Sequence, residues 1–418
     1  MKVKMKNSGI EWIGEIPEDW KVIKIGSIFA CRNEKVSDSD FTPLSVSKDG
    51  VVYQMKNVAK SDAGDNRKLV LKNDFVINSR SDRKQSCGVS TLDGSVSLIN
   101  IVLYEVTNGV IFSGYTKFVM KNYGFAEEFY RWGHGIVADL WTTGWQEMKN
   151  IGLPIPSFSE QQQIAAYLDK KCALVERLIE NQRRQIEKLK EYKQSVITET
   201  VTKGLDHSVP MKDSGIEWIG KIPEDWKVVY LSSICSEHKR KNTGLVCKNL
   251  LSLSYGEIKR KDINTTDGLL PESFEGYNII EKGDIVLRLT DLQNDQRSLR
   301  TGIAHETGLI TSAYVTIRCL QNVACPYYIH YYLHSFDISK GFYGMGDGVR
   351  QGLNYAGIRK IMMLIPPMKT QQQIAAYLDK KCAEIDALIA IKQQKIDKLQ
   401  EYKKSLIYEY VTGKKEVL

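Results

Sequence analysis

The feature that most constrains this chain is an internal repeat. Residues 8–22 have the sequence SGIEWIGEIPEDWKV, and residues 214–228 have SGIEWIGKIPEDWKV, so one position in fifteen differs. A second motif, QQQIAAYLDKKCA, occurs at residues 161–173 and is repeated unchanged at 371–383. The copies are offset by 206 residues for the first motif and by 210 for the second. Because this period is far longer than a solenoid unit, it predicts a duplicated pair of domains.

Each half consists of a repeated opening motif, a long variable segment and a helical segment. The variable segments are nearly unrelated, but short β-rich runs align by eye: 73–80 with 283–290, and 88–90 with 302–304. The strands therefore correspond, whereas the loop between them spans 81–87 in one half and 291–301 in the other. Loops on a constant scaffold are where recognition usually diverges.

The helical segments carry a heptad seam, with apolar or tolerated positions in alternating steps of four and three. The positions are Leu168, Cys172, Val175, Ile179, Gln182, Ile186, Leu189, Lys193 and Val196, then Leu378, Cys382, Ile385, Ile389, Lys392, Ile396, Leu399, Lys403 and Leu406. The polar residues Gln182 and Lys392 favour one register. A long helix with a narrow apolar stripe needs a partner. We expect the two copies to pair antiparallel and to hold the variable domains at opposite ends of a rigid spacer, in an elongated molecule with pseudo-two-fold symmetry.

The predicted fold class is α+β, with two similar domains that are each followed by a long helix. We place the first variable domain at residues 1–157, its helix at 158–203, the second variable domain at 204–368 and its helix at 369–418. A heptad stripe taken alone is usually only a packing device. Here the packing role and a functional role can coincide, because a protein that recognises two separate sites needs a spacer of fixed length between its two recognition domains.

Composition narrows the function less than the repeat does. The chain has 58 Lys and Arg against 50 Asp and Glu, a net charge of +8, which permits a nucleic-acid partner without identifying one. The eight cysteines form no CxxC pair and no Cys/His cluster, so we expect reduced thiols. The sequence has no apolar run of bilayer length and no signal peptide, which predicts a soluble cytoplasmic protein that does not bind membranes.

Catalytic motifs are missing from the sequence. It contains no phosphate loop, no GxGxxG after a strand, no HExxH and no Asn-Pro-Pro-aromatic run of the kind that amino-methyltransferases use. The glycine cluster at 341–352 has irregular spacing, which favours a flexible turn over a nucleotide site. We therefore predict a chain that is not a catalyst.

The opening motifs, the IP junctions at 156–169 and 366–379 and the doubled domain-helix plan together resemble the specificity subunit of type I restriction-modification systems. The resemblance covers nearly the whole chain. It implies two target recognition domains, each reading half of an asymmetric, interrupted DNA site, and helical regions that set the spacing and dock two modification subunits. It also implies that the partners hold the cofactors: S-adenosylmethionine for adenine methylation on the modification subunits, and ATP and magnesium on the restriction subunits. The second junction departs slightly, with Thr370 in place of Glu160.

Arg, Lys, Asn and Gln on loops are the side chains that read base edges. The predicted DNA contacts are Arg80, Arg83, Lys84, Gln85, Trp145 and Gln146 in the first half, and Arg288, Gln293, Asn294, Arg297, Arg300, Arg350, Gln351 and Asn354 in the second. For each loop, the alternative is a solvated surface turn. The basic runs 238–241 and 259–261 are better candidates for phosphate contacts or solvated faces, and the repeated tryptophans for packing.

Two other classes of function stay open. One is a coiled-coil scaffold with globular heads that bind protein, but scaffolding does not call for dissimilar heads on nearly identical frames. The other is a self-sufficient DNA enzyme, against which the missing catalytic motifs count.

Overall fold

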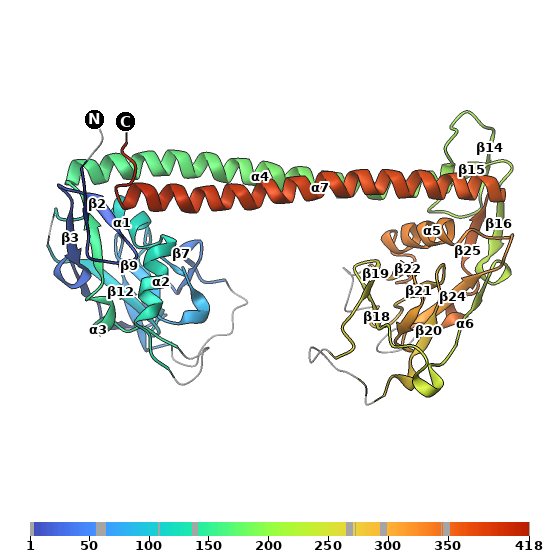
Figure 1. Cartoon of the computed structure of the whole chain (residues 1–418), viewed down its shortest axis with the longest axis horizontal. Helices are drawn as coiled ribbons and strands as arrows, with labels where there is room; N and C mark the ends of the chain where they lie inside the picture. The colour runs from blue at the N-terminus through green and yellow to red at the C-terminus, as the bar shows by residue number, and fades with distance from the viewer. Residues whose placement is uncertain are drawn as a thin grey trace. The chain divides into compact units, whose positions relative to one another are not determined.

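The structure is a computed structural model that describes residues 4–55, 64–107, 109–135, 141–264, 271, 273–292, 299–343, 345 and 352–417. The chain divides into two compact units. Unit 1 comprises Met1–Arg183 and Gln393–Leu418, and unit 2 comprises Arg184–Lys392. The two long helices, α4 (Phe158–Lys203) and α7 (Met368–Val411), each contribute one part to each unit (Figure 1).

The remaining elements of unit 1 are β1 (Met5–Asn7), β2 (Glu15–Pro17), β3 (Lys21–Lys24), η1 (Ile25–Ser27), β4 (Phe29–Cys31), β5 (Lys35–Val36), β6 (Leu44–Ser47), β7 (Gly50–Tyr53), β8 (Arg67–Val70), β9 (Phe75–Asn78), η2 (Ser81–Arg83), β10 (Cys87–Val89), β11 (Gly94–Ser97), β12 (Asn100–Glu105), α1 (Ser113–Val119), α2 (Tyr123–Arg131), α3 (Trp145–Met148) and β13 (Gly152–Ile155).

Those of unit 2 are β14 (Met211–Asp213), β15 (Lys221–Pro223), β16 (Lys227–Tyr230), η4 (Leu231–Ser233), β17 (Cys235–Glu237), η5 (Thr243–Leu245), β18 (Leu251–Ser254), β19 (Glu257–Arg260), η6 (Phe274–Gly276), β20 (Asn278–Ile280), β21 (Ile285–Leu287), β22 (Thr301–Ile303), β23 (Gly308–Ile310), β24 (Val315–Cys319), α5 (Pro326–Ile338), α6 (Tyr355–Ile358) and β25 (Met362–Ile365).

Each unit contains its own four-stranded antiparallel sheet, and the two sheets have corresponding strand orders. The order is β10-β9-β12-β4 in unit 1 and β22-β21-β24-β17 in unit 2. Both faces of β9 are buried: Phe75 and Ile77 belong to the main core of unit 1, and Val76 belongs to a smaller one. The same alternation occurs in β21 of unit 2, where Ile285 and Leu287 belong to the main core and Val286 to a smaller one, as expected for a strand that is covered on both sides. The units differ in their helices, since α1 and α2 of unit 1 correspond to α5 alone.

The long helices pair antiparallel within each unit. In unit 1 the rings of Tyr167 and Tyr410 lie 4.6 Å apart and Lys403 contacts Glu176 at 2.5 Å, whereas in unit 2 Lys193 contacts Asp386 at 2.6 Å. The repeat relates these two ion pairs to each other. Every predicted seam residue is buried or half-buried, and most residues between them are exposed. The α+β fold with duplicated domains and paired helices is confirmed.

The first glutamine of each QQQIAAYL motif fastens the domain to its helix. The side chains of Gln161 and Gln371 have no exposed surface. The three bonds of Gln161 are to Phe112 N at 2.7 Å, Val110 O at 3.0 Å and Pro156 O at 3.0 Å, and those of Gln371 are to Cys325 N at 2.8 Å, Val323 O at 3.3 Å and Pro366 O at 2.9 Å. The repeated motif therefore encodes a repeated joint.

We expect the Gln161→Ala variant to lower the free energy of unfolding by about 3 kcal/mol, because it leaves a buried N–H and two carbonyls unpaired and opens a cavity. Urea denaturation measures the change. Gln162 is exposed on the same helical turn, so Gln162→Ala is the matched control. Equal effects of the two substitutions would contradict the assigned joint.

The ends of the long helices close the cores. The hydroxyl of Tyr115 lies 2.9 Å from both Pro154 O and Val411 O, and the repeat places Tyr328 in the same way, 3.0 Å from Leu364 O and 3.2 Å from Val201 O. Of the repeated tryptophans, which we predicted to pack in the core or between domains, Trp12, Trp20 and Trp226 are core residues and Trp218 is half-buried against the core of unit 2. Among the described residues, no helix combines the length and apolar character needed to cross a bilayer.

Two histidines on α5 are held in their neutral form. Both side chains are half-buried. This burial, with the positive charges of neighbouring histidines, lowers the pKa of His330 to about 3, and burial together with Lys193 lowers that of His334 to about 4. The unfolded chain takes up these protons near pH 6.5, before the folded chain does. The free energy of unfolding therefore rises with pH between these lowered pKa values and about pH 6.5, and it falls when the solution is acidified through the same range.

Between pH 6 and pH 4.5, the His330→Gln/His334→Gln variant should lose less stability than the parent chain, by as much as about 1.4 kcal/mol per pH unit for each histidine. Denaturation midpoints at a series of pH values measure this slope. The exposed His207 provides the control His207→Gln, which should keep the parent slope. An unchanged slope in the double variant would show that neither histidine is shielded.

Candidate nucleic-acid interface

The structure brings together the two predicted stretches in each unit. In unit 1, Thr143 N donates to Ser79 O at 3.0 Å and joins the 79–85 loop to the 141–146 turn. In unit 2, Leu353 N donates to Leu289 O at 2.8 Å and joins the end of β21 to the segment before α6. The repeat relates these two bonds residue by residue. Each unit thus builds one surface from two stretches that are far apart in sequence.

Three cations of the 79–85 loop of unit 1 contact two carboxylates, so two arginines share one aspartate. Arg80 Nε and Arg83 Nε lie 3.2 and 3.5 Å from the two carboxylate oxygens of Asp82, and Lys84 Nζ lies 3.0 Å from Glu127. The Arg83 side chain is 66% exposed, so its contact with Asp82 is solvated and exchangeable. Gln85 is half-buried and has a positive φ of 63° where the loop returns to β10.

The 141–146 turn lies beside that loop. Trp145 is half-buried and packs on the main core, whereas Gln146 is exposed. Trp141 Nε1 donates to Tyr130 O at 2.9 Å, which holds the turn against α2. An open pocket of about 460 Å³ lies between loop and turn and is lined by Ser81, Lys84, Glu127, Tyr130, Arg131 and Trp141.

The predicted residues of unit 2 have three different placements. Arg288 is half-buried at the end of β21, and Asn354 is exposed and caps α6 by accepting a bond from Gly357 N at 3.1 Å. Arg300 has no exposed surface and donates to Arg288 O at 3.1 Å and Thr290 O at 2.9 Å, beneath the loop. The other predicted contacts of this unit, Gln293, Asn294, Arg297, Arg350 and Gln351, lie outside the described residues.

The basic runs of unit 2 are held by acids and carbonyls. Lys239 contacts Glu237 at 2.8 Å, Lys241 Nζ donates to Gly276 O at 2.7 Å, and Arg260 contacts Glu306 at 2.5 Å. Their charges are therefore largely compensated in the free chain, which fits solvated faces or phosphate contacts better than base reading.

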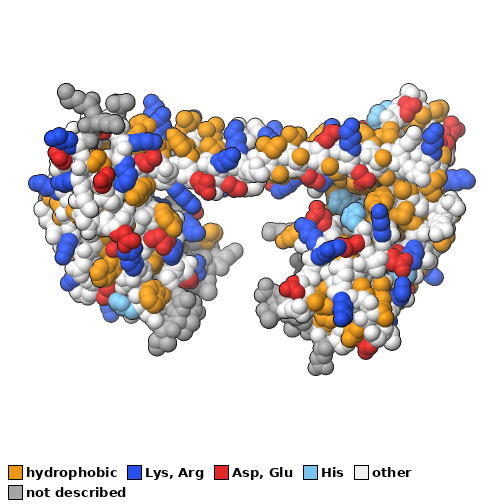
Figure 2. Space-filling model, viewed as in Figure 1, with side chains coloured by type: hydrophobic (Ala, Val, Ile, Leu, Met, Phe, Trp, Pro, Cys, Tyr) orange, Lys and Arg blue, Asp and Glu red, His pale blue; other side chains and the backbone are white. Residues whose placement is uncertain are grey.

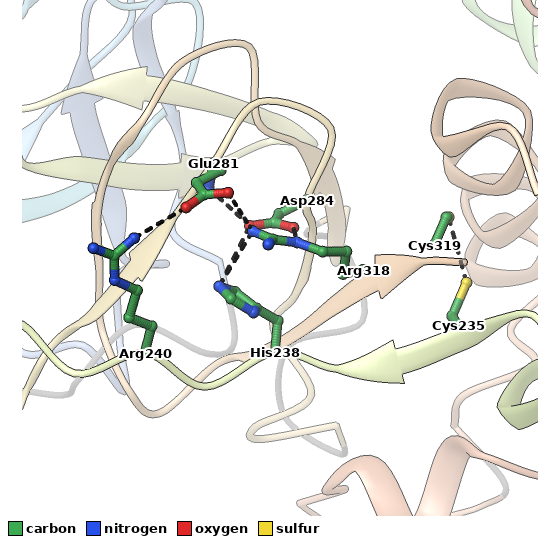
Figure 3. A network of polar contacts seen from close by, with 7 residues as sticks. All are labelled: Cys235, His238, Arg240, Glu281, Asp284, Arg318 and Cys319. Carbon is green, nitrogen blue, oxygen red and sulfur yellow. Dashed lines mark hydrogen bonds and ion pairs between the residues drawn. The ribbon is translucent and has the colours of Figure 1, made fainter. Parts of the chain in front are cut away.

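A buried aspartate organises the far end of the central strand in each unit, and sequence reasoning missed it. Asp284 is 1% exposed and accepts two bonds from Arg318, at 2.7 and 2.8 Å, which raise the pKa of Arg318 (Figure 3). Arg318 also contacts Glu281 at 2.9 Å, and Glu281 contacts Arg240 at 3.1 Å. The signal that could have revealed this site is the alignment of Asp284 with Asp74 across the repeat.

In unit 1 the corresponding buried aspartate is paired with an arginine from a different part of the sheet. Asp74 is paired with Arg32, at 2.8 and 3.1 Å, and the Arg32 guanidinium lies 4.7 Å from the ring centroid of Tyr104. Strand register places Arg318 at the position of Tyr104, and His238 at that of Arg32. The buried carboxylate is thus fixed by the scaffold, while the strand that supplies its cation changes. Across the described residues, no group of three or more His, Cys, Asp or Glu could hold a metal ion.

Comparisons with known proteins agree with the resemblance in the sequence. No family model matches the chain. A putative type I restriction enzyme MjaX specificity subunit from Methanocaldococcus jannaschii is 23% identical over 437 residues, covering 96% of this chain and 95% of the relative. The MjaVIII specificity subunit from the same organism is 25% identical over 281 residues, covering 64% of this chain and 62% of the relative.

Solved structures show the same fold. A chain from work on complex assembly and conformational transition of the type I R-M system matches with a TM-score of 0.69 at 13% identity, covering 95% of this chain and 98% of that one. The HsdS subunit from Thermoanaerobacter tengcongensis matches with a TM-score of 0.51 at 14% identity and the same coverage.

Proposed function

On the premise that this chain is a type I restriction enzyme specificity subunit, as its homologues are, we propose that it recognises an asymmetric, bipartite DNA site. Unit 1 binds one half-site and unit 2 binds the other. The observation that carries this proposal is the paired surface. The same backbone bond, Thr143 to Ser79 or Leu353 to Leu289, assembles it in both units, while the side chains around it differ. A constant frame with different side chains suits two different half-sites.

The exposed basic side chains supply both the phosphate contacts and the base contacts of DNA binding. Arg83 and Lys84 in unit 1 exchange their carboxylate partners for phosphates or base edges, and phosphate contacts make the affinity fall with salt. Arginine reads guanine with two bonds, and Asn or Gln reads adenine. Gln146 and Asn354, exposed at the start of α3 and α6, are placed for such contacts. The predicted residues outside the described ranges complete the set for unit 2.

The chain itself is proposed to be a non-catalytic subunit of a cytoplasmic complex. The chemistry belongs to its partners: modification subunits that bind S-adenosylmethionine and methylate adenine, and restriction subunits that use ATP and magnesium. The homologues support this division of labour because they are named as specificity subunits.

The paired helices carry two equivalent surfaces for modification subunits. Leu178 and Tyr402 in unit 1 are 41% and 52% exposed, and their counterparts in the repeat, Leu388 and Tyr192, are 48% and 50% exposed. Each directly precedes a seam residue, so the leucine of one helix and the tyrosine of the other share a flank of the pair. Hydrophobic side chains are visible along these helices in Figure 2. Two equivalent apolar patches fit two copies of one partner.

Expressing the chain with the adenine methyltransferase subunit encoded beside it tests the proposal. Methylated adenines are mapped across the host genome by single-molecule sequencing. We expect an interrupted, asymmetric motif that disappears when this chain is omitted. An assembled, active complex whose methylation does not depend on this chain would instead favour a scaffold with protein-binding heads.

A further inference from the structure

We infer that each unit contains a buried brace, Tyr130 in unit 1 and Arg300 with Tyr343 in unit 2, that positions the recognition loop and so determines which bases that unit reads. The inference rests on the proposed function and adds specificity-determining residues that lie beneath the surface that meets DNA. The two braces occupy corresponding places, and the repeat aligns Tyr343 with Tyr130, whereas Arg300 has no counterpart of its kind in unit 1.

In unit 2 the brace is centred on Arg300, which directly follows the loop. Besides the carbonyls of Arg288 and Thr290, its guanidinium reaches Asp291 O at 3.4 Å, so one side chain holds three carbonyls that precede the loop. Its backbone N–H donates to Asp337 of α5 at 2.7 Å. Because burial of an arginine is costly unless its donors are paired, these bonds fix both ends of the loop.

Arg300 also contacts a residue that precedes the second recognition stretch of its unit. Its Nε donates to the Tyr343 hydroxyl at 3.3 Å, and the guanidinium lies 5.1 Å from the centroid of the Tyr343 ring. Tyr343 follows α5 and leads into the glycine-rich segment before α6. The described residues at both ends of the loop after β21 are therefore coupled to Tyr343 through Arg300.

In unit 1 the repeat places a small residue, Ser86, where unit 2 has Arg300. Tyr130 of α2 takes over the coupling. Its hydroxyl lies 3.1 Å from Asn78 O and 3.3 Å from Arg83 O, one on each side of the turn in the loop. Its own carbonyl accepts the bond from Trp141 Nε1. One tyrosine thus joins the 79–85 loop to the 141–146 turn.

Loop geometry decides base specificity because a base-reading bond requires its donor and acceptor within about 3.2 Å and near the right angle. A loop that shifts by 1 Å keeps its phosphate attraction but loses the fit to particular base edges. Tyr130 and Arg300 act through the loops that they hold, so they are positioning residues. Loss of a brace should broaden the half-site of its own unit and leave the other half-site unchanged.

Two conservative variants, Tyr130→Phe and Tyr343→Phe, remove only the bracing hydroxyls. Each is assembled with the modification subunits, and methylation rates are measured on the cognate duplex and on duplexes with one base changed in either half-site. We expect Tyr130→Phe to reduce discrimination about tenfold in one half-site only, and Tyr343→Phe to do so in the other half-site only. The unaffected half-site is an internal control, and Tyr53→Phe, at a side chain 60% exposed, should alter neither.

A purely structural role for the hydroxyls would lower the rate on all duplexes by the same factor and leave the ratios unchanged, and this result would overturn the inference. Equal relaxation of both half-sites by either variant would also overturn it. Failure of the proposed function is a separate outcome, since the unaltered chain would then direct no methylation motif.

Discussion

The Leu178→Asp variant is expected to bind one modification subunit, whereas we propose that the unaltered chain binds two. Leu178 is 41% exposed on the apolar flank of the paired helices, and a carboxylate there stays hydrated in the free chain but has to be desolvated in an apolar interface. We expect the affinity of that one site to fall by about 100-fold or more. Native mass spectrometry of the purified complex counts the bound subunits.

The repeat supplies the matched variants. Leu388→Asp should remove the other subunit, and the double variant should bind none. Arg177→Gln changes the charge by the same amount as Leu178→Asp at an exposed position on a different face of α4, so it should leave both sites intact. If Leu178→Asp retains two subunits at full affinity, the docking surface lies elsewhere on the chain.

The paired helices could be predicted from the sequence because helical periodicity is local and repeats. Each seam position, from Leu168 to Val196 and from Leu378 to Leu406, is covered in the structure. Gly302 shows why the strand alignment also held. A Cβ at this position would lie 2.5 Å from a terminal methyl group of Leu253 on β18, so the close approach of a neighbouring hairpin favours glycine there. Gly88 occupies the corresponding position in unit 1, 3.1 Å from Gly50 of β7 by the same measure.

Other parts of the site depend on partners that are distant in sequence. Arg300 was predicted among the DNA contacts because an arginine beside a loop looks the same in sequence whether it is exposed or buried. Its burial depends on Asp337 and Tyr343, which follow it by 37 and 43 residues. The cation that pairs with the buried aspartate was equally hidden in the sequence. Arg32 pairs with Asp74 in unit 1, whereas Arg318 on β24 pairs with Asp284 in unit 2. The bases that we propose the loops read have no local signal in the sequence, because DNA shape adds specificity at positions that no side chain touches.

The Val411→Asp variant is expected to unfold the N-terminal domain selectively, although it changes a residue at the far end of the chain. Val411 has no exposed surface, belongs to the main core of unit 1 and accepts the Tyr115 bond through its carbonyl. An unpaired carboxylate in that core costs about 4 kcal/mol or more. Hydrogen exchange should therefore show lost amide protection at residues 5–155 and retained protection at 211–365.

The repeat again provides the converse experiment. Val201 has the same place in unit 2, with no exposed surface and its carbonyl accepting from Tyr328, so Val201→Asp should expose 211–365 and leave 5–155 protected. Lys404→Asp, at an exposed position on α7, should expose neither. Loss of protection in both domains from either core variant would mean that the chain unfolds as one cooperative body. If each variant instead acts on one domain only, the C-terminal end of α7 completes the core of unit 1 and the C-terminal end of α4 completes the core of unit 2. The two halves of the repeat then depend on each other for stability.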